Sequence, residues 1–156
     1  MRSDTVTIRP AVLKDIEEMI LLLKSLFSLE ADFQFNRSLQ EAGLKQLLNA
    51  DGALALVAED QGRVVGMCTG QTVISTAEGG PALLVEDVVV SPDRQGNGIG
   101  RCLLQALIDQ ARQQGISRLQ LLADSNNSGA LAFYEKLGWQ STRLICLRTS
   151  TDRGKK

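Results

Sequence analysis

The sequence predicts a mixed α/β domain, in which short strands and longer helices alternate along one chain. Short β-branched runs such as Val88-Val89-Val90 alternate with segments whose apolar residues recur every third or fourth position. Clusters of Gly and Pro separate these segments, as expected for turns. The length of 156 residues suits one domain with a substantial core. We expect that domain over residues 1–150, followed by a frayed polar tail at 151–156.

In the N-terminal half, alternation of β-branched residues predicts a strand at 5–9, which Pro10 ends. The spacing of Ile16, Met19, Ile20 and Leu23 predicts an amphipathic helix over 13–27. Ser38 is the expected cap of a second helix that runs to about residue 48. Strands at 53–59 and 63–74 follow, joined by a tight turn at 60–62.

In the C-terminal half, a further strand is expected at 83–90, where the valine run is typical of burial on both faces. Apolar residues at every fourth position predict a helix over 99–114, and Gly115 stands where helices usually end. A short strand at 119–123, a helix at 127–137 and a final strand at 141–148 complete the expected order.

The most informative segment joins the 83–90 strand to the 99–114 helix. It reads Ser91-Pro-Asp-Arg-Gln-Gly-Asn-Gly-Ile-Gly100. Several main-chain N–H groups at a helix start lack a partner within the helix, which makes this place suitable for an anion. Glycines allow a phosphate to approach that backbone closely. A strand carrying Glu86 and Asp87 therefore leads directly into a candidate phosphate-binding loop.

Two other phosphate-binding signatures fit less well. A Walker loop requires Gly-Lys-Ser or Gly-Lys-Thr, and neither occurs in the chain. The dinucleotide fingerprint requires a third small residue, but Arg101 or Leu103 stands at that place, depending on the starting glycine. Asp124 lies at the spacing of a ribose-binding acid, although the loop comes late in the chain rather than in a first βα unit. Nicotinamide binding is therefore the weaker alternative.

A second motif follows the glycine loop, and the two motifs together resemble those of one known family. Asn127-Ser-Gly-Ala-Leu-Ala-Phe-Tyr134 followed by Leu137-Gly-Trp139 resembles the second signature block of the GNAT superfamily of N-acetyltransferases, with Trp139 in place of the usual Phe. The segment 95–100 resembles that family's Gln/Arg-x-x-Gly-x-Gly loop. Together the two blocks cover residues 85–139. The resemblance implies a mostly antiparallel sheet of about six to seven strands, flanked by about four helices.

The resemblance also implies acetyl-CoA as cosubstrate, with no metal. Its pyrophosphate is expected on the loop backbone and its pantetheine arm along the signature strand and the second block. The implied cofactor-binding residues are Val88, Val89, Val90, Gln95, Gly96, Asn97, Gly98, Ile99, Gly100, Arg101, Asn127, Ala130 and Phe133. Asn127 equally suits a helix cap, and Phe133 suits the core. Arg94 and Arg101 either add charge at the phosphate or are solvated surface residues.

The same resemblance assigns the catalytic roles. Tyr134, the chain's single tyrosine, would protonate the departing thiolate, whereas the alternative is a half-buried aromatic with a bonded hydroxyl. The chain has no histidine, so a carboxylate is the leading candidate base. Glu86 is that candidate. Neighbouring strand residues point to opposite faces unless a bulge intervenes, and the family places a bulge near here. Asp87 is expected to orient the substrate or to satisfy buried main-chain donors.

The acceptor is expected to be the primary amine of a small molecule, attacked directly in a ternary complex. Glu30 and Asp32, in the linker after the first helix, are the expected acceptor-binding residues beside Asp87. They favour a cationic amine, although solvated loop charges explain them equally well. The alternative function is a catalytically silent acyl-CoA sensor or interaction domain.

Composition limits the remaining classes. A net charge of -1 gives no general attraction for nucleic acid, and the apolar runs are too short to span a membrane. Three widely spaced cysteines, expected to be buried and reduced, favour neither a metal site nor a disulfide framework. We therefore expect a cytoplasmic protein. The resemblance to the GNAT superfamily also implies that the protein forms a homodimer.

Overall fold

The structure is a computed structural model that describes residues 6–30 and 32–152. The chain divides into two compact units, Met1–Leu121 and Leu122–Lys156, and each is described by itself. The single domain expected over 1–150 stays a prediction. Of the expected polar tail, residues 153–156 lie outside the described part.

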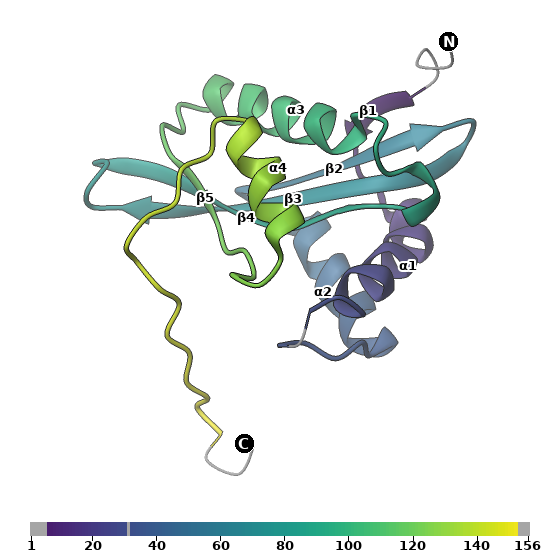
Figure 1. Ribbon diagram of the computed structural model, residues 1–156, viewed down its shortest axis with the longest axis horizontal. Coiled ribbons are helices and arrows are strands. Elements are labelled where there is room, and N and C mark those ends of the chain that lie inside the picture. The colour runs from purple at the N-terminus through teal and green to yellow at the C-terminus, as the bar shows by residue number, and fades with distance from the viewer. Residues whose placement is uncertain (1–5, 31, 153–156) are drawn as a thin grey trace. The chain divides into compact units, whose positions relative to one another are not determined.

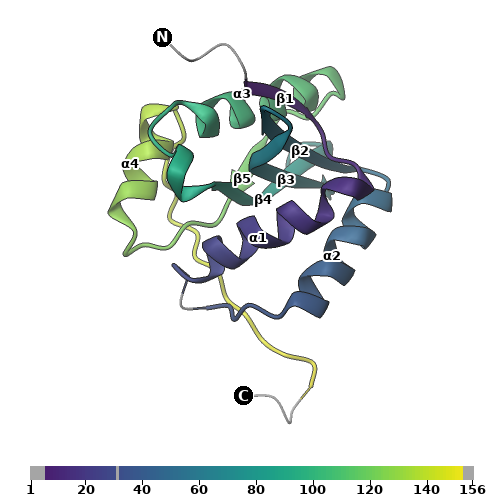
Figure 2. The same cartoon turned by 90° about the vertical axis from the view of Figure 1, so that its right-hand side faces the viewer.

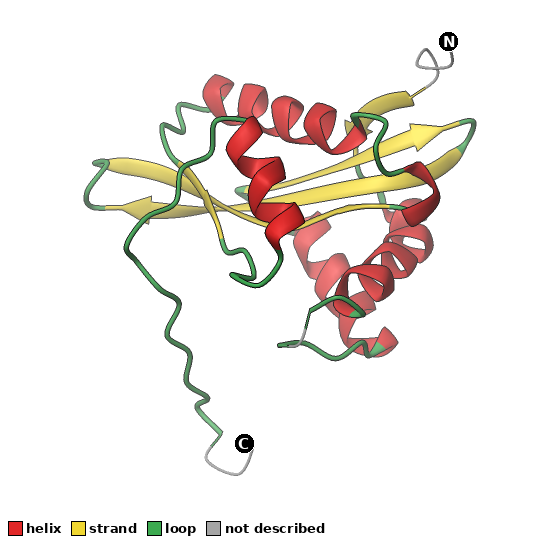
Figure 3. Cartoon of the chain, in the orientation of Figure 1, coloured by secondary structure: helices red, strands yellow, loops and turns green. Residues whose placement is uncertain are grey.

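A twisted sheet forms the centre of the first unit (Figure 1). Its strand order follows the sequence, and neighbouring strands are antiparallel except for β4 and β5, which are parallel. Figure 3 shows the strands in yellow between the helices. The strands are β1 (Val6–Pro10), β2 (Ala53–Asp60), β3 (Arg63–Ser75), β4 (Gly80–Val90) and β5 (Leu119–Leu121).

Helices cover both faces of this sheet (Figure 2). The helices α1 (Ile16–Phe27) and α2 (Arg37–Asn49) lie on one face, and α3 (Ile99–Gln113) lies on the other. Fully buried Met19 and Ile20 of α1 pack with Val57 of β2 and Met67 of β3. This apolar contact, which the periodicity of 13–27 predicts, holds α1 against the sheet.

A glycine on β3 allows α3 to come close to the other face. A Cβ atom at Gly66 would lie 3.1 Å from Leu103 Cδ1 and 3.3 Å from Ile99 Cγ2, both in the first half of α3. The Cβ would also lie 3.3 Å from Val89 O of β4, so an alanine here would require its neighbours to shift by a few tenths of an ångström. Gly66 consequently sets how closely the start of α3 approaches the sheet.

The second unit contains α4 (Ser128–Lys136), and Asn127 caps it with its side-chain oxygen, which accepts from Ala130 N at 3.0 Å. Gly138, at φ 90°, ends the helix in the left-handed conformation. No strand follows within the described residues, so the strand expected at 141–148 is wrong. Its Leu144 and Ile145 are 87% and 79% exposed, and the segment has no partner strand.

The fold otherwise agrees with the expected GNAT-like class. The described residues form five strands instead of six to seven, and the four helices agree with the expected number. Asn36, not Ser38, caps α2, because its side chain accepts from Leu39 N at 3.3 Å. No helix within residues 6–30 and 32–152 has the length and apolar character needed to cross a membrane.

The cysteines also differ from expectation. Cys68 is buried and burial raises its pKa to about 12, so this thiol stays protonated. Cys102 and Cys146 are exposed, which corrects the expectation that all three are buried. Cys102 faces outward because its neighbours Leu103 and Leu104 occupy the apolar stripe of α3.

Candidate active site

The loop between β4 and α3 leaves a row of main-chain donors unused. Within the described residues, the N–H groups of Gly96 through Arg101 donate to no protein acceptor, and the first bond of α3 runs from Cys102 N to Gly98 O at 3.1 Å. Gly96 and Gly98 have φ values of 79° and 78°, which other residues adopt only with strain. These donors, with the positive end of the helix, form a site suited to a phosphate group.

Side chains of the loop hold its own carbonyl groups. Asn97 Nδ2 donates to Arg94 O at 3.0 Å and to Gln95 O at 3.3 Å, and Gln95 Nε2 donates to Val90 O at 3.1 Å. The carbonyl groups are therefore turned inward and occupied, while the N–H groups remain available. Gln95 and Asn97, predicted as cofactor-binding residues, thus also have a structural role in shaping the loop.

The strand β4 offers a free edge next to this loop. Its ladder with β5 covers only Leu83, Leu84 and Val85, whereas its ladder with β3 continues to Val90. Beyond Val85, one edge of β4 therefore has no neighbouring strand among the described residues. An extended chain with amide groups can add to such an edge, as peptides do in β-augmentation. Val88, Val89 and Val90, predicted to bind the pantetheine arm, lie along this edge.

A β-bulge interrupts β4 at its two acidic residues. Thr69 pairs with Glu86 and Met67 pairs with Val89, so β4 has an extra residue between these pairs. Asp87 has a φ of 52°, in the left-handed region. The bulge removes the simple alternation of the strand: Glu86 is exposed and Asp87 is partly buried.

Thr69 holds the Asp87 carboxyl group in place. The Thr69 hydroxyl, on a residue that is 2% exposed, lies 3.1 Å from Glu86 O and 3.2 Å from Asp87 Oδ2. This hydroxyl has one proton, and a carbonyl oxygen can only accept. The Glu86 carbonyl and the Asp87 carboxyl group therefore share the one proton that Thr69 Oγ1 donates.

The electrostatic surroundings of Asp87 favour its protonated form. Burial, and next the negative charge of Glu86, raise the pKa of Asp87 to about 6, and Glu30 adds to the effect although the Thr69 hydroxyl opposes it. Glu30, from the segment after α1, is therefore within electrostatic reach of the bulge. The structure thus brings together Glu30 and Asp87, two of the predicted acceptor-binding residues, and their role in binding stays a prediction.

The other predicted acceptor residue, Asp32, is exposed on the segment that follows α1. Glu78, another acidic residue near the 75–81 turn, accepts from Ser117 Oγ at 3.0 Å and from Arg118 Nη1 at 3.3 Å. Arg118 therefore already forms an ion pair with the Glu78 carboxylate. Within residues 6–30 and 32–152, Glu86 and Asp87 at the bulge form no ion pair with a lysine or arginine.

The second signature block lies on α4. Phe133 and Tyr134 are partly buried, and the Tyr134 ring contacts those of Phe133 and Trp139, with centroids 5.2 and 5.9 Å apart. Phe133 is therefore not a fully buried core residue. At Trp139, where the family usually has Phe, the main-chain N–H donates to the main-chain oxygen of Tyr134 at 3.0 Å. This aromatic cluster fixes the orientation of the Tyr134 ring.

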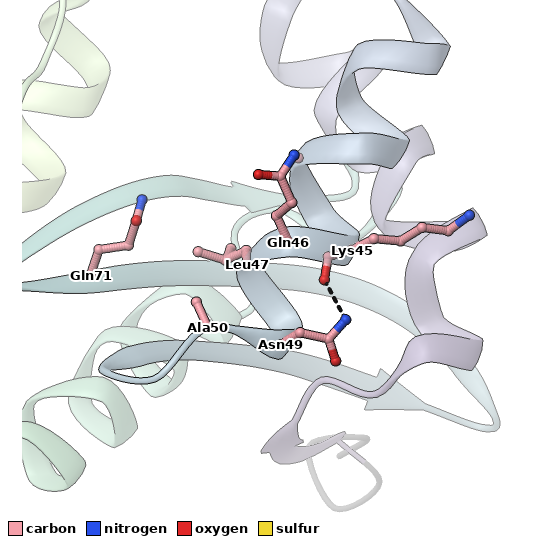
Figure 4. A pocket seen from close by; sticks show the side chains of 7 residues that line it. Lys45, Gln46, Leu47, Asn49, Ala50 and Gln71 are labelled. Atoms are coloured by element: carbon pink, nitrogen blue, oxygen red, sulfur yellow. Dashed lines mark hydrogen bonds between the residues drawn. The ribbon is translucent and has the colours of Figure 1, made fainter.

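A hollow of about 680 Å³ lies elsewhere, between the C-terminal half of α2 and β3 (Figure 4). Its lining includes Lys45, Asn49 and Gln71 but no carboxylate and no predicted site residue. Asn49 Nδ2 donates to Lys45 O at 2.9 Å at its rim. The hollow has no group that could accept a proton from an amine, so the bulge is the better candidate for chemistry.

Thr69 is the site residue that sequence reasoning missed. It lies inside a long strand with no motif around it, and only the pairing of β3 with the bulge brings its hydroxyl to Asp87. A threonine within the mainly apolar run 64–70 of this strand is a weak signal, because threonines are common in strands.

The chain is similar to several known acetyltransferases. A mycothiol acetyltransferase of Kocuria rhizophila is 39% identical over 89 residues, which is 56% of this chain but only 29% of that protein. The solved structure of a ribosomal-protein-alanine N-acetyltransferase of Brucella melitensis is 25% identical, with a TM-score of 0.77 over 94% of this chain and 99% of that chain.

An aminoglycoside N-acetyltransferase solved in complex with CoA shares the fold, with a TM-score of 0.80, 17% identity and coverage of 94% and 95% of the two chains. The sequence model described as the acetyltransferase (GNAT) family matches residues 20–139, which include the bulge, the glycine loop and the α4 block. This chain is a member of the GNAT family of acetyltransferases.

Proposed function

We propose that this acetyltransferase moves an acetyl group from acetyl-CoA to the primary amine of a small cationic acceptor, by direct attack in a ternary complex. The observation that carries the proposal is the row of free N–H groups from Gly96 to Arg101, next to a strand edge and a pair of carboxylates. These features would respectively hold a pyrophosphate, an amide-containing arm and an ammonium group.

In this proposal the loop N–H groups bind the pyrophosphate, and the free edge along Val88 to Val90 binds the pantetheine amides. Asn127 Oδ1 is occupied by the α4 cap, which leaves the Asn127 amide N–H groups as donors to the arm. Acetyl-CoA supplies a thioester, whose carbonyl carbon is electrophilic and whose thiolate leaves readily.

Glu86 is the proposed base, because it is exposed and an alkyl amine with a pKa near 10 is almost entirely protonated at neutral pH. Glu86 takes the ammonium proton directly or through a water, and the amine lone pair then forms the N–C bond as the C–S bond breaks. Tyr134 is proposed to give its hydroxyl proton to the departing thiolate, and the second proton that the nitrogen loses on becoming an amide restores the tyrosine hydroxyl.

Asp87 and the neighbouring Glu30 are proposed to attract the cationic acceptor, with Asp32 at the outer side of the same region. The similar proteins include a mycothiol acetyltransferase, a ribosomal-protein-alanine N-acetyltransferase and an aminoglycoside N-acetyltransferase. Their acceptors differ, so the acidic charge at the bulge is the argument for a cation here. The proposal includes a cytoplasmic location and a homodimer.

The deciding experiment measures thiol release from acetyl-CoA in the presence of polyamines, amino acids, aminoglycosides and amino sugars. We expect turnover with at least one cationic amine. Glu86→Gln and Tyr134→Phe should each lower kcat by about 10²-fold or more while the dissociation constant for CoA stays the same.

Two other outcomes have a clear meaning. Tight CoA binding by calorimetry without turnover on any amine would contradict the small-molecule acceptor and favour a protein acceptor or an acyl-CoA sensor. Covalent acetylation of exposed Cys146 in a rapid-quench experiment would contradict direct transfer, since the acetyl group would then pass through the enzyme.

A further inference from the structure

The β2–β3 turn and the glycine loop carry complementary charges at the same end of the sheet (Figure 1). Asp60 and Arg63 are directly paired across this turn, whose two central residues, Gln61 and Gly62, have φ values of 51° and 80°. Two left-handed residues define a tight hairpin turn, so the two charged side chains are held at a fixed spacing.

The short 3-10 helix Pro92–Arg94, at the start of the glycine loop, meets this turn with two opposite charges. Arg94 Nη1 forms an ion pair with Asp60 Oδ2, and Arg63 Nη2 donates to Asp93 Oδ2 at 2.8 Å. The first pair is the inner one, with side chains that are 28% and 5% exposed, whereas those of the second are 53% and 58% exposed. Buried pairs are screened less by water, so the inner pair is the stronger constraint.

Arg94 continues into the part of the loop that presents the free donors. Its carbonyl oxygen accepts from Asn97 Nδ2 at 3.0 Å, and Asn97 lies within the Gly96–Arg101 row. Ser91 N, at the other end of the 3-10 helix, donates to Val65 O of β3 at 2.8 Å. The position of Arg94 is therefore transmitted to the donors through the loop backbone and one side chain.

We propose that Asp60 is a positioning residue for the pyrophosphate: it holds Arg94, and through Arg94 it orders the N–H groups of Gly96 to Arg101. This inference rests on the proposed function, because it assumes that these N–H groups bind CoA. In this inference Arg94 forms an ion pair within the protein instead of contacting the phosphate, a choice that the sequence leaves open. Ordering before binding lowers the entropy cost of binding and so increases affinity.

The two roles of Arg94 predict opposite effects of Asp60→Asn on the dissociation constant for CoA, measured by calorimetry. If Asp60 positions the loop, Asp60→Asn and Arg94→Gln both weaken CoA binding, on the order of tenfold. If Arg94 contacts the phosphate itself, Asp60→Asn frees this arginine, and CoA binding stays the same or tightens. That second result would overturn the proposal.

Further variants separate positioning from a loss of fold. The double variant Asp60→Asn/Arg94→Gln removes both charges, so no unpaired charge stays buried, and it should still bind CoA weakly. Arg63→Gln is the matched control at the exposed outer pair, where we expect less than about a twofold change. S-acetylpantetheine, which lacks the pyrophosphate, should bind all of these variants as it binds the unchanged protein. A parallel loss for this ligand would contradict positioning of the pyrophosphate donors.

Backbone ¹⁵N order parameters of the ligand-free protein distinguish the two proposals. Lower order parameters over 95–101 in Asp60→Asn, with unchanged values in α1, support the ordering role whatever the ligand is. Unchanged order parameters together with unchanged CoA affinity overturn it and leave the proposed function standing. Failure of the unchanged protein to bind CoA overturns the proposed function and the assignment of a pyrophosphate, even if the order parameters show that Asp60 orders the loop.

Discussion

Asp87 combines a strained backbone, a single hydroxyl partner and a negative neighbour, and its titration should be visible in the pH dependence of activity. Its raised pKa of about 6 means that it is protonated below that pH and ionised above it. Ionised Asp87 attracts a cationic amine, so kcat/KM for the amine should fall as pH drops through about 6. Initial-rate measurements from pH 5 to 9 test this.

The isosteric variant gives the control. Asp87→Asn removes the titrating group, so the acidic limb near pH 6 should disappear and the KM for the amine should increase while kcat changes little. A limb that persists in this variant would assign the titration to another group. Thr69→Val, which removes the hydroxyl partner and its opposing influence, should move the limb to higher pH.

At the scale of an element, α4 allows the two roles of Asn127 to be separated. The side-chain oxygen caps the helix, and the amide donors are available to the cosubstrate. Asn127→Asp keeps the capping oxygen and loses the donors, so acetyl-CoA affinity should fall while stability stays near that of the unchanged protein. Asn127→Ala should lose both, with a stability decrease of about 1 kcal/mol. Urea unfolding and calorimetry give the two readouts.

Elements and loops with local signals were predictable, and those that depend on distant partners were not. The apolar spacing of α1 and α3 and the glycines of the loop act within a few residues, so their positions follow from the sequence. The contact of Thr69 with Asp87 depends on strand register, and the ion pair of Asp60 with Arg94 depends on how a hairpin meets a loop. Neither leaves a pattern in a single sequence.

The expected strand at 141–148 is a case in which a local signal is present but the distant partner is absent. Its residues have strand character, but a strand requires a neighbour, and no partner pairs with this segment within the described residues. The error over the α2 cap is smaller: both Asn36 and Ser38 are good capping residues, and only the backbone geometry distinguishes them.

At the scale of the whole molecule, one buried ion pair should control acid stability. Arg9 donates to both carboxyl oxygens of Asp15, at 2.8 and 2.9 Å, and to Glu59 at 2.8 Å, which ties β1 to β2 and to the start of α1. The Arg9 hydrogen bonds hold the pKa of Asp15 below its model-compound value of 3.8, despite the opposing effect of burial. The folded state thus favours the ionised form of this carboxyl group.

The sign of the pH effect follows from that lowered pKa. The stabilisation is present above pH 3.8 and is lost as pH falls through the lower pKa of the folded state. Asp15→Asn should reduce the free energy of unfolding at pH 7 by about 3 kcal/mol, because Arg9 loses its main partner. The difference from the unchanged protein should shrink below pH 3.8.

Urea unfolding at pH 7 and pH 3 measures both effects. Glu17→Gln is the control, since Glu17 pairs with Arg37 on the surface, where side chains are 67% and 51% exposed, and we expect a change below about 0.5 kcal/mol. An equal loss in Asp15→Asn at both pH values would show that the pair does not carry the acid dependence.

Gly66 has a consequence that extends beyond packing. The free N–H groups of the loop belong to the turn that starts α3, and Gly66 determines how near that turn lies to the sheet. In a mutational screen, Gly66→Ala would therefore be scored as a cofactor-affinity defect, although the residue lies on an interior strand. Under the proposed function, cosubstrate affinity would thus depend on a position that no ligand contact would reveal.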